Sequence, residues 1–202
     1  TATFNLIPFD YSLSVPGVTV QQGSTASQTI TVTRLQGTAQ LVTVAVGALP
    51  AGVTLTGGNS QSCTPTSGSC SVTFTYSAIA SASTGSSSVS YTGTSSGIAN
   101  KVGTFSLTVT AIPTFTININ KPGTGSGTVT SSPVGINCGG TCSASFNQGT
   151  SVTLSAAASA DSTFAGWSNG CSGTGTCIVS AAASPTATFN LIPFDYSLSV
   201  PG

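Results

Sequence analysis

The chain has 202 residues, of which only 3% are charged, whereas about 25% are charged in an average soluble protein. Three Lys or Arg balance three Asp, and there is no Glu, His or Met, so electrostatic attraction to nucleic acid or to an anionic membrane is excluded. The same scarcity leaves few groups for general acid–base catalysis, and no run approaches the roughly 18 apolar residues that span a bilayer.

The opening segment of the chain, Thr1–Gly17, returns unchanged as its closing segment, Thr186–Gly202. The shift between the two copies is 185 residues (position 186 against position 1). That period is longer than the roughly 20–50 residues of a solenoid repeat and fits a string of whole domains. The sequence therefore predicts one period of a tandem array. Residues 1–8 would be the last strand of the preceding repeat, and residues 193–202 the first strand of the first domain of the next repeat.

Several segments alternate apolar residues with Thr, Ser, Ala or Asn, a period-two pattern typical of half-buried antiparallel strands. In chain order they are Thr29–Thr33, Val42–Val46, Val72–Tyr76, Phe105–Val109, Phe115–Ile119 and Ala187–Leu191. Turn residues such as Pro16-Gly17, Gly57-Gly58 and Gly139-Gly140 separate the segments. No segment has the pattern of an amphipathic helix, so we predict an all-β chain.

Residues 9–112 are predicted to form an immunoglobulin-like (Ig-like) sandwich, because about seven candidate strands over about 100 residues suit that fold. The opening Asp10–Gly23 and the segment Leu49–Leu55 resemble Ig-like domains of large bacterial surface proteins. The Cys–Trp–Cys core pattern of antibody domains is absent. Cys63 and Cys70 are so close in sequence that we expect them to pin a loop and not to join two sheets.

Residues 113–192 are predicted to form a second, smaller all-β domain that contains disulfides. Its segments follow one another as Gly125–Pro133, Ile136–Cys142, Gly149–Leu154, Phe164–Trp167, Cys171–Cys177 and Ala187–Phe189. In that order they resemble the divergent InlB-B-type bacterial repeat, a small all-β module of secreted and surface proteins. The resemblance implies an extracellular spacer or adhesin role and no chemistry. Proline at the Ile112-Pro113 and Ile192-Pro193 junctions restricts the backbone, so we expect a semi-rigid array.

The six cysteines lie in three local pairs, namely Cys63 with Cys70, Cys138 with Cys142 and Cys171 with Cys177. Many pairings are formally open, and pairing of neighbours is favoured because each pair brackets a Gly-, Ser- or Thr-rich turn. Oxidised pairs place a protein outside the cytosol. Zinc binding is the alternative, but these spacings without any His suit zinc poorly.

The aromatic side chains have a functional and a plainer interpretation. Trp167 could be a platform for sugar stacking, but a lone Trp beside a disulfide-bracketed turn is more often part of the core. Tyr11, Tyr76 and Tyr91 fall in predicted strands, so we expect them to pack. No run of exposed aromatic residues suggests a carbohydrate groove, while the many Ser and Thr residues leave O-glycosylation open.

The few charged side chains also allow two interpretations. Lys101, Lys121 or Arg34 could be scattered solvated charges, or one lysine could join an intramolecular Lys–Asn isopeptide bond, which needs an adjacent carboxylic acid. Asp10 and Asp161 are the distinct acids of one period, and they are isolated in sequence. Calcium would need clustered acids, so no metal and no cofactor is predicted.

We predict a structural role: the chain is a repeat unit of an extracellular bacterial filament, stalk or giant surface protein, and not an enzyme. Its partners would be neighbouring repeats of the same protein, with no nucleic acid and no membrane insertion. The alternative is an adhesin repeat that binds a glycan or a host protein. The inter-repeat strand (Thr186, Ala187, Thr188, Phe189, Asn190 and Leu191) either folds back within its own chain or is donated between subunits. The exact repeat favours one long chain.

Overall fold

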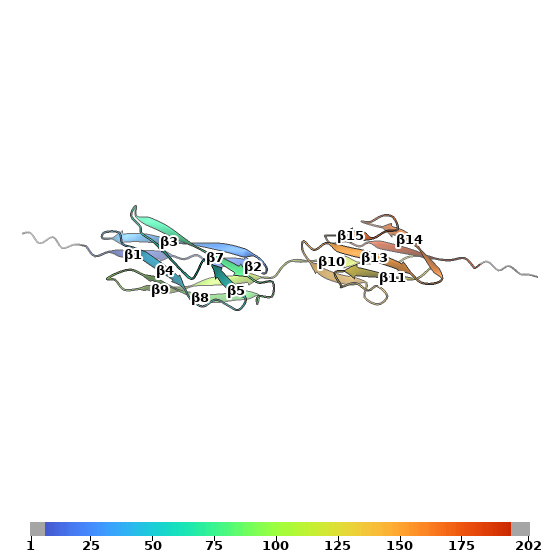
Figure 1. Cartoon of the computed structure of the whole chain (residues 1–202), viewed down its shortest axis with the longest axis horizontal. Helices are drawn as coiled ribbons and strands as arrows, with labels where there is room; N and C mark the ends of the chain where they lie inside the picture. Colours follow the sequence, from blue (N-terminus) through green and yellow to red (C-terminus); the bar gives the residue numbers. More distant parts are fainter. Residues whose placement is uncertain (1–6, 195–202) are drawn as a thin grey trace, which may run out of the picture. The chain divides into compact units, whose positions relative to one another are not determined.

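The structure is a computed structural model that describes residues 7–194, and it divides into two compact units between Ile112 and Pro113. The described residues form β-strands and no helix (Figure 1). This confirms the all-β prediction. Each of the six alternating segments lies in or overlaps a strand. A sheet with one buried face and one solvent-exposed face buries every second side chain, which produces this alternation.

Nine strands make up the first unit, and all of them lie in two sheets. They are β1 (Asp10–Ser14), β2 (Val18–Gln21), β3 (Thr25–Gln36), β4 (Val42–Val46), β5 (Val53–Thr56), β6 (Ser60–Cys63), β7 (Ser69–Ala78), β8 (Gly85–Thr94) and β9 (Lys101–Thr110). One sheet has the order β1-β3-β7-β5, and the other has the order β2-β9-β8-β4-β6. Their apolar faces meet in one core that includes Ile30, Val44, Phe74, Tyr76 and Leu107, each with no exposed surface. The unit is an Ig-like β-sandwich.

The count of nine strands exceeds the predicted seven for two reasons. The first extended stretch is interrupted at Val15-Pro16-Gly17, so β1 joins one sheet and β2 joins the other. Proline removes a backbone donor, which favours such an interruption. The additional short strand β6 carries the chain from β5 across to the second sheet and back to β7.

A buried polar contact fixes the interruption between β1 and β2. Gln28 is 2% exposed; its side-chain amide donates to the carbonyl of Pro16 at 2.5 Å, and its oxygen accepts from the hydroxyl of Tyr76 at 2.5 Å. A buried amide is tolerated when its donors and acceptors are paired in this way. The contact holds the start of the unit against the centre of its core.

Seven strands make up the second unit. They are β10 (Thr114–Asn118), β11 (Gly127–Ser132), β12 (Ser143–Asn147), β13 (Val152–Ala158), β14 (Ser162–Ser168), β15 (Cys177–Val179) and β16 (Thr186–Leu191). They form three small sheets, with the orders β10-β12, β11-β13-β15 and β14-β16. The sheets enclose a separate core that contains Ile117, Leu154, Trp167, Ala187 and Phe189. The last strand of the unit, β16, therefore contributes two buried side chains, those of Ala187 and Phe189, to this core.

Candidate functional site

The second copy of the duplicated segment completes the second unit. Its strand β16 pairs antiparallel with β14 of the same chain, from Ser168 opposite Thr186 to Ser162 opposite Leu191. Ala187 is 0% exposed and Phe189 is 1% exposed. The ring of Phe189 packs on that of Phe164 at 5.3 Å between centroids. In this structure the inter-repeat strand thus folds back within its own chain.

Equivalent residues in the two copies of the duplicated segment lie in different environments. Phe9 is 3% exposed and stacks on Tyr11 at 5.8 Å, whereas its duplicate Phe194 is 76% exposed. The backbone of Pro8 and Phe9 lies so close to Gly37, at φ +72°, that a Cβ on Gly37 would be 2.6 Å from the Pro8 carbonyl oxygen. Residues 1–6 and 195–202 lie outside the described part of the chain, so the strands predicted there remain predictions.

In each unit, a segment near the start of the unit pairs in parallel with a segment near its end, an arrangement that the alternating pattern does not reveal. In the first unit β2 is parallel to β9, with Val18 opposite Leu107 and Gln21 opposite Thr110. The N–H of Gln22 extends this pairing by donating to the Thr110 carbonyl at 2.9 Å. The prediction that the strands are antiparallel is therefore wrong for this pair, since periodicity reports burial and not strand direction.

In the second unit β10 and the residues that follow it run parallel to the end of the chain. Isolated parallel bridges join Ile117 to Ala183 and Asn120 to Thr186. We call the backbone pairing between Thr116–Pro122 and Ala183–Phe189 the terminal ladder of the second unit. It lies on the edge of β16 that faces away from β14, so β16 is bonded along both of its edges.

The structure joins each cysteine to its neighbour in the chain. The three disulfides are Cys63–Cys70, Cys138–Cys142 and Cys171–Cys177, with sequence separations of 7, 4 and 6. Cys63–Cys70 closes the loop between β6 and β7, as predicted, but the prediction that it does not join two sheets is wrong, because Cys63 ends β6 of one sheet and Cys70 lies in β7 of the other. A pair so close in sequence can bridge two sheets because the chain changes sheet between these residues. Their Cα atoms are 6.1 Å apart.

Replacing both Cys63 and Cys70 with Ser should destabilise the first unit by about 2 kcal/mol, because the chain entropy of the unfolded state is no longer restricted. The second unit should keep its stability. Urea unfolding followed by tyrosine near-ultraviolet circular dichroism reports the first unit, and Trp167 fluorescence reports the second. The matched change of Cys138 and Cys142 to Ser should affect the Trp167 transition instead. Equal effects of both double variants on both transitions would contradict the assignment.

Trp167 belongs to the core, as predicted, and it also anchors the loop closed by Cys171–Cys177. Its side chain is 5% exposed and stands edge-on to Phe164 at 5.4 Å between centroids. Its indole N–H donates to the Gly175 carbonyl and its backbone N–H donates to the Gly173 carbonyl, both at 2.8 Å. A ring held in this way offers no face for stacking on a sugar.

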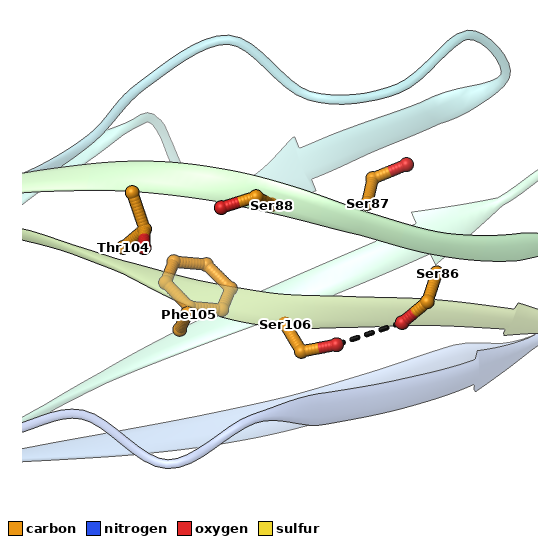
Figure 2. Close-up of a pocket in the computed structure, with 6 residues that line it drawn as sticks. All are labelled: Ser86, Ser87, Ser88, Thr104, Phe105 and Ser106. Atoms are coloured by element: carbon orange, nitrogen blue, oxygen red, sulfur yellow. Dashed lines mark hydrogen bonds between the residues drawn. The ribbon is translucent and has the colours of Figure 1, made fainter.

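A hollow of about 390 Å³ lies along β8 and β9 of the first unit (Figure 2). Five hydroxyl side chains and Phe105 line it, namely Ser86, Ser87, Ser88, Thr104 and Ser106. The hydroxyls of Ser86 and Ser106 bond to each other at 2.7 Å. No base or acid lines the hollow, so its hydroxyls have no neighbouring group that could activate them as nucleophiles.

Pairs of hydroxyl side chains also connect neighbouring strands elsewhere. They include Thr43 with Ser62 at 2.8 Å and Thr116 with Ser145 at 3.0 Å. Such cross-strand pairs contribute a few tenths of a kcal/mol each. They give the outer faces a polar and uncharged surface, which agrees with the scarcity of charge in the sequence.

The lysines are engaged in ordinary polar contacts. Lys101 forms an ion pair with Asp10 at 2.9 Å, and the Lys121 ammonium donates to the carbonyls of Gly127 and Cys138. The hydrogen bond from Lys101 holds the pKa of Asp10 below its usual value, so the contribution of this pair is present above the ordinary pKa of Asp and is lost as the pH falls through the lowered value. Within residues 7–194, no group of three His, Cys, Asp or Glu side chains could hold a metal ion.

Alkaline pH should destabilise the first unit through Tyr76. Burial raises the pKa of Tyr76 from 10.0 to about 12, and the ionised phenol would also lose its hydrogen bond to Gln28. Because the folded-state pKa is raised, the contribution of Tyr76 to the free energy of unfolding is fully present below pH 10. It falls by roughly 2 kcal/mol between about pH 10 and 12. Urea unfolding across this range should show a weaker pH dependence for Tyr76→Phe than for the parent chain. That variant should be about 1–3 kcal/mol less stable at neutral pH, since the Gln28 oxygen is left unpaired. An unchanged pH dependence would contradict the prediction.

No known protein family and no curated protein matches this sequence. Among solved structures, the chain is similar to Escherichia coli alpha-2-macroglobulin (18% identity, TM-score 0.40), over 60% of this chain and 7% of that protein. It is also similar to a CARDB domain from Pyrococcus furiosus (19% identity, TM-score 0.35), over 55% of this chain and 94% of that domain. An I-band fragment of titin is 11% identical, with a TM-score of 0.32 and coverage of 93% of this chain and 66% of the fragment. These scores are low, so the description of the fold rests on strand order and register. In residues 7–194 no helix is long and apolar enough to cross a membrane.

Proposed function

We propose that the chain is a structural repeat of an extracellular bacterial filament, stalk or giant surface protein, joined head to tail to further copies of itself. The observation that carries the proposal is the duplicated segment. Its second copy supplies the last strand of the second unit, while Phe9 of its first copy enters the core of the first unit. One segment can therefore end one repeat and begin the next. Only Pro193 separates Ile192, whose N–H donates to the backbone carbonyl of Asp161, from the exposed Phe194.

The two junctions support a stiff array. Pro113 is bonded to the second unit through Gln148, whose N–H donates to its carbonyl at 2.7 Å, and Thr110 is bonded to the first unit through Gln22. Only residues 111 and 112 lie between these two bonded residues, unlike a flexible Gly/Ser linker. The three disulfides agree with an extracellular location. The order of glycines and cysteines in the second unit supports its assignment as a divergent InlB-B-type repeat.

The adhesin alternative has less support among the described residues. The hollow beside Ser86 and Ser106 is lined mainly by hydroxyls, and the side chain of Trp167 is buried. Ligand sites are usually lined by hydrophobic and aromatic side chains, with a few precisely placed polar groups. A mechanical and non-enzymatic role needs neither.

The size of the native polypeptide tests the proposal. The 202-residue chain has a mass of 19.7 kDa. Native material that has been reduced and boiled should migrate on a denaturing gel far above that mass, and its electron micrographs should show a regular axial spacing. A single band near the mass of one period would refute the tandem array.

A further inference from the structure

We propose that the terminal ladder of the second unit is a mechanical clamp that resists tension along the chain. The inference rests on the proposed function in one respect, namely that tension reaches the unit through its two ends. The ladder is distinct from the β2–β9 pairing of the first unit, and it lies in the smaller unit, which has no large sheet to share a load.

The ladder consists of five backbone hydrogen bonds in one constant register. The N–H groups of Asn118 and Asn120 donate to the carbonyls of Ala183 and Pro185, both at 3.0 Å. In the opposite sense, Ala183 donates to Thr116 at 3.3 Å, Ala187 to Asn120 at 2.8 Å and Phe189 to Pro122 at 3.2 Å. Even spacing along both segments is the pattern of parallel β-pairing.

Parallel pairing decides how tension acts on these bonds. The chain enters the unit just before Thr116, at one end of the ladder, and leaves it beyond Phe189, at the other end. Pulling the two ends apart therefore slides one segment along the other, and all five bonds are strained at once. An antiparallel terminal pair, with both ends on the same side, would open one bond at a time at a lower force.

Side-chain packing keeps the two segments in register. Ile117 and Ala187 are 0% exposed, and Phe189 is 1% exposed, so the apolar side chains of both segments are buried in the same core. The close approach also depends on Gly123, whose φ is +115°, because a Cβ there would overlap the Phe189 carbonyl. Sliding the ladder by even one residue would pull these side chains out of their sites.

β16 cannot leave the unit by breaking the ladder alone. Its other edge is paired with β14 over Ser162–Ser168, so tension on the end of the chain is opposed on both edges of the strand. The ladder is thus the direct link between the two ends of the unit, and β14 supports the strand that carries the load.

Single-molecule force spectroscopy on the oxidised chain tests the clamp by comparing Asn120→Pro with Asn120→Ala. Asn120 is exposed, so neither change leaves a cavity, but only Pro removes the N–H that donates to Pro185. At a given force, Asn120→Pro should speed unfolding of the second unit about tenfold relative to the parent chain, and Asn120→Ala should leave it nearly unchanged.

The two units are told apart by the length that each releases. With the disulfides intact, the residues inside each disulfide loop add no length, and every other unfolded residue adds about 3.5 Å of chain. Unfolding between Thr116 and Phe189 should therefore release about 220 Å of chain, and unfolding between Val18 and Thr110 about 300 Å. Only the shorter events should change in Asn120→Pro. Equal unfolding rates under force for the Pro and Ala variants would overturn the clamp.

A second measurement keeps the proposal testable if Asn120→Pro does not fold. Handles attached at the exposed residues Thr114 and Ile192 load the ladder lengthwise, whereas handles at Thr114 and Ser184 pull on one end of it. The first geometry should need the higher force, and equal forces would refute the clamp. Neither experiment depends on the size of the native polypeptide, so the tandem array could be refuted while the clamp is supported, or the clamp refuted while the tandem array is supported.

Discussion

A chain that begins at Ile7 and ends at Pro185 should fold its first unit and lose the fold of its second. The missing strand β16 supplies Ala187 and Phe189, which are 0% and 1% exposed, to the core of that unit. Removing a buried Phe side chain alone costs about 3–5 kcal/mol, which is a large part of the roughly 5–15 kcal/mol that stabilises a typical domain. The truncation also leaves one edge of β14 and the carbonyls of Asn120 and Pro122 without partners.

Fluorescence measures this loss directly, because Trp167 is the single Trp of the chain and belongs to the second unit. Its emission should shift to the wavelength of a solvated indole, while the near-ultraviolet circular dichroism of the tyrosines persists. The matched control begins at Ile7 and ends at Ile192, which retains β16, and it should show a buried Trp. A native Trp167 spectrum in the shorter chain would mean that β16 is dispensable.

The alternating pattern of the sequence predicts the positions of six of the sixteen strands in the described residues. The segment Val42–Val46 coincides with β4, and Val72–Tyr76 lies within β7, because residues with one face in a core must alternate every second position. The same argument placed Phe115–Ile119 and Ala187–Leu191 on β10 and β16, give or take one residue. The buried position of Trp167 also followed from sequence.

The pairing of the strands could not be predicted in the same way. Alternation is identical for parallel and antiparallel neighbours, so it could not show that β2 lies parallel to β9 or that Ala183–Phe189 lies parallel to Thr116–Pro122. The crossing of β6 between sheets depends on contacts with β4, and it reversed the expected role of Cys63–Cys70. Gln28 was also missed, because nothing in a polar residue of a strand marks it as buried.

Exchanging Phe9 for Ala should destabilise the first unit by about 3–5 kcal/mol, whereas the same change at its duplicate Phe194 should cost less than about 0.5 kcal/mol. The two residues stand at equivalent positions of the duplicated segment, but Phe9 is 3% exposed and stacks on Tyr11, while Phe194 is 76% exposed. Urea unfolding measures the difference, followed by tyrosine near-ultraviolet circular dichroism for Phe9→Ala in the first unit and by Trp167 fluorescence for Phe194→Ala in the second unit. A similar cost at both positions would show that the exposed state of Phe194 is not the one present in solution.

The decisive comparison repeats the pair of variants in a chain extended by one further period. If Phe194 begins the next Ig-like unit, it becomes that unit's counterpart of Phe9, and Phe194→Ala should now carry the full cost of about 3–5 kcal/mol. The extended chain holds two copies of the first unit, so each variant should weaken one copy and split the unfolding curve into two transitions. Phe194→Ala without effect in the extended chain would contradict the head-to-tail arrangement. If adding sequence after Phe194 raises the cost of this substitution by several kcal/mol, the Phe194 ring must have become buried in a core equivalent to the one that buries Phe9.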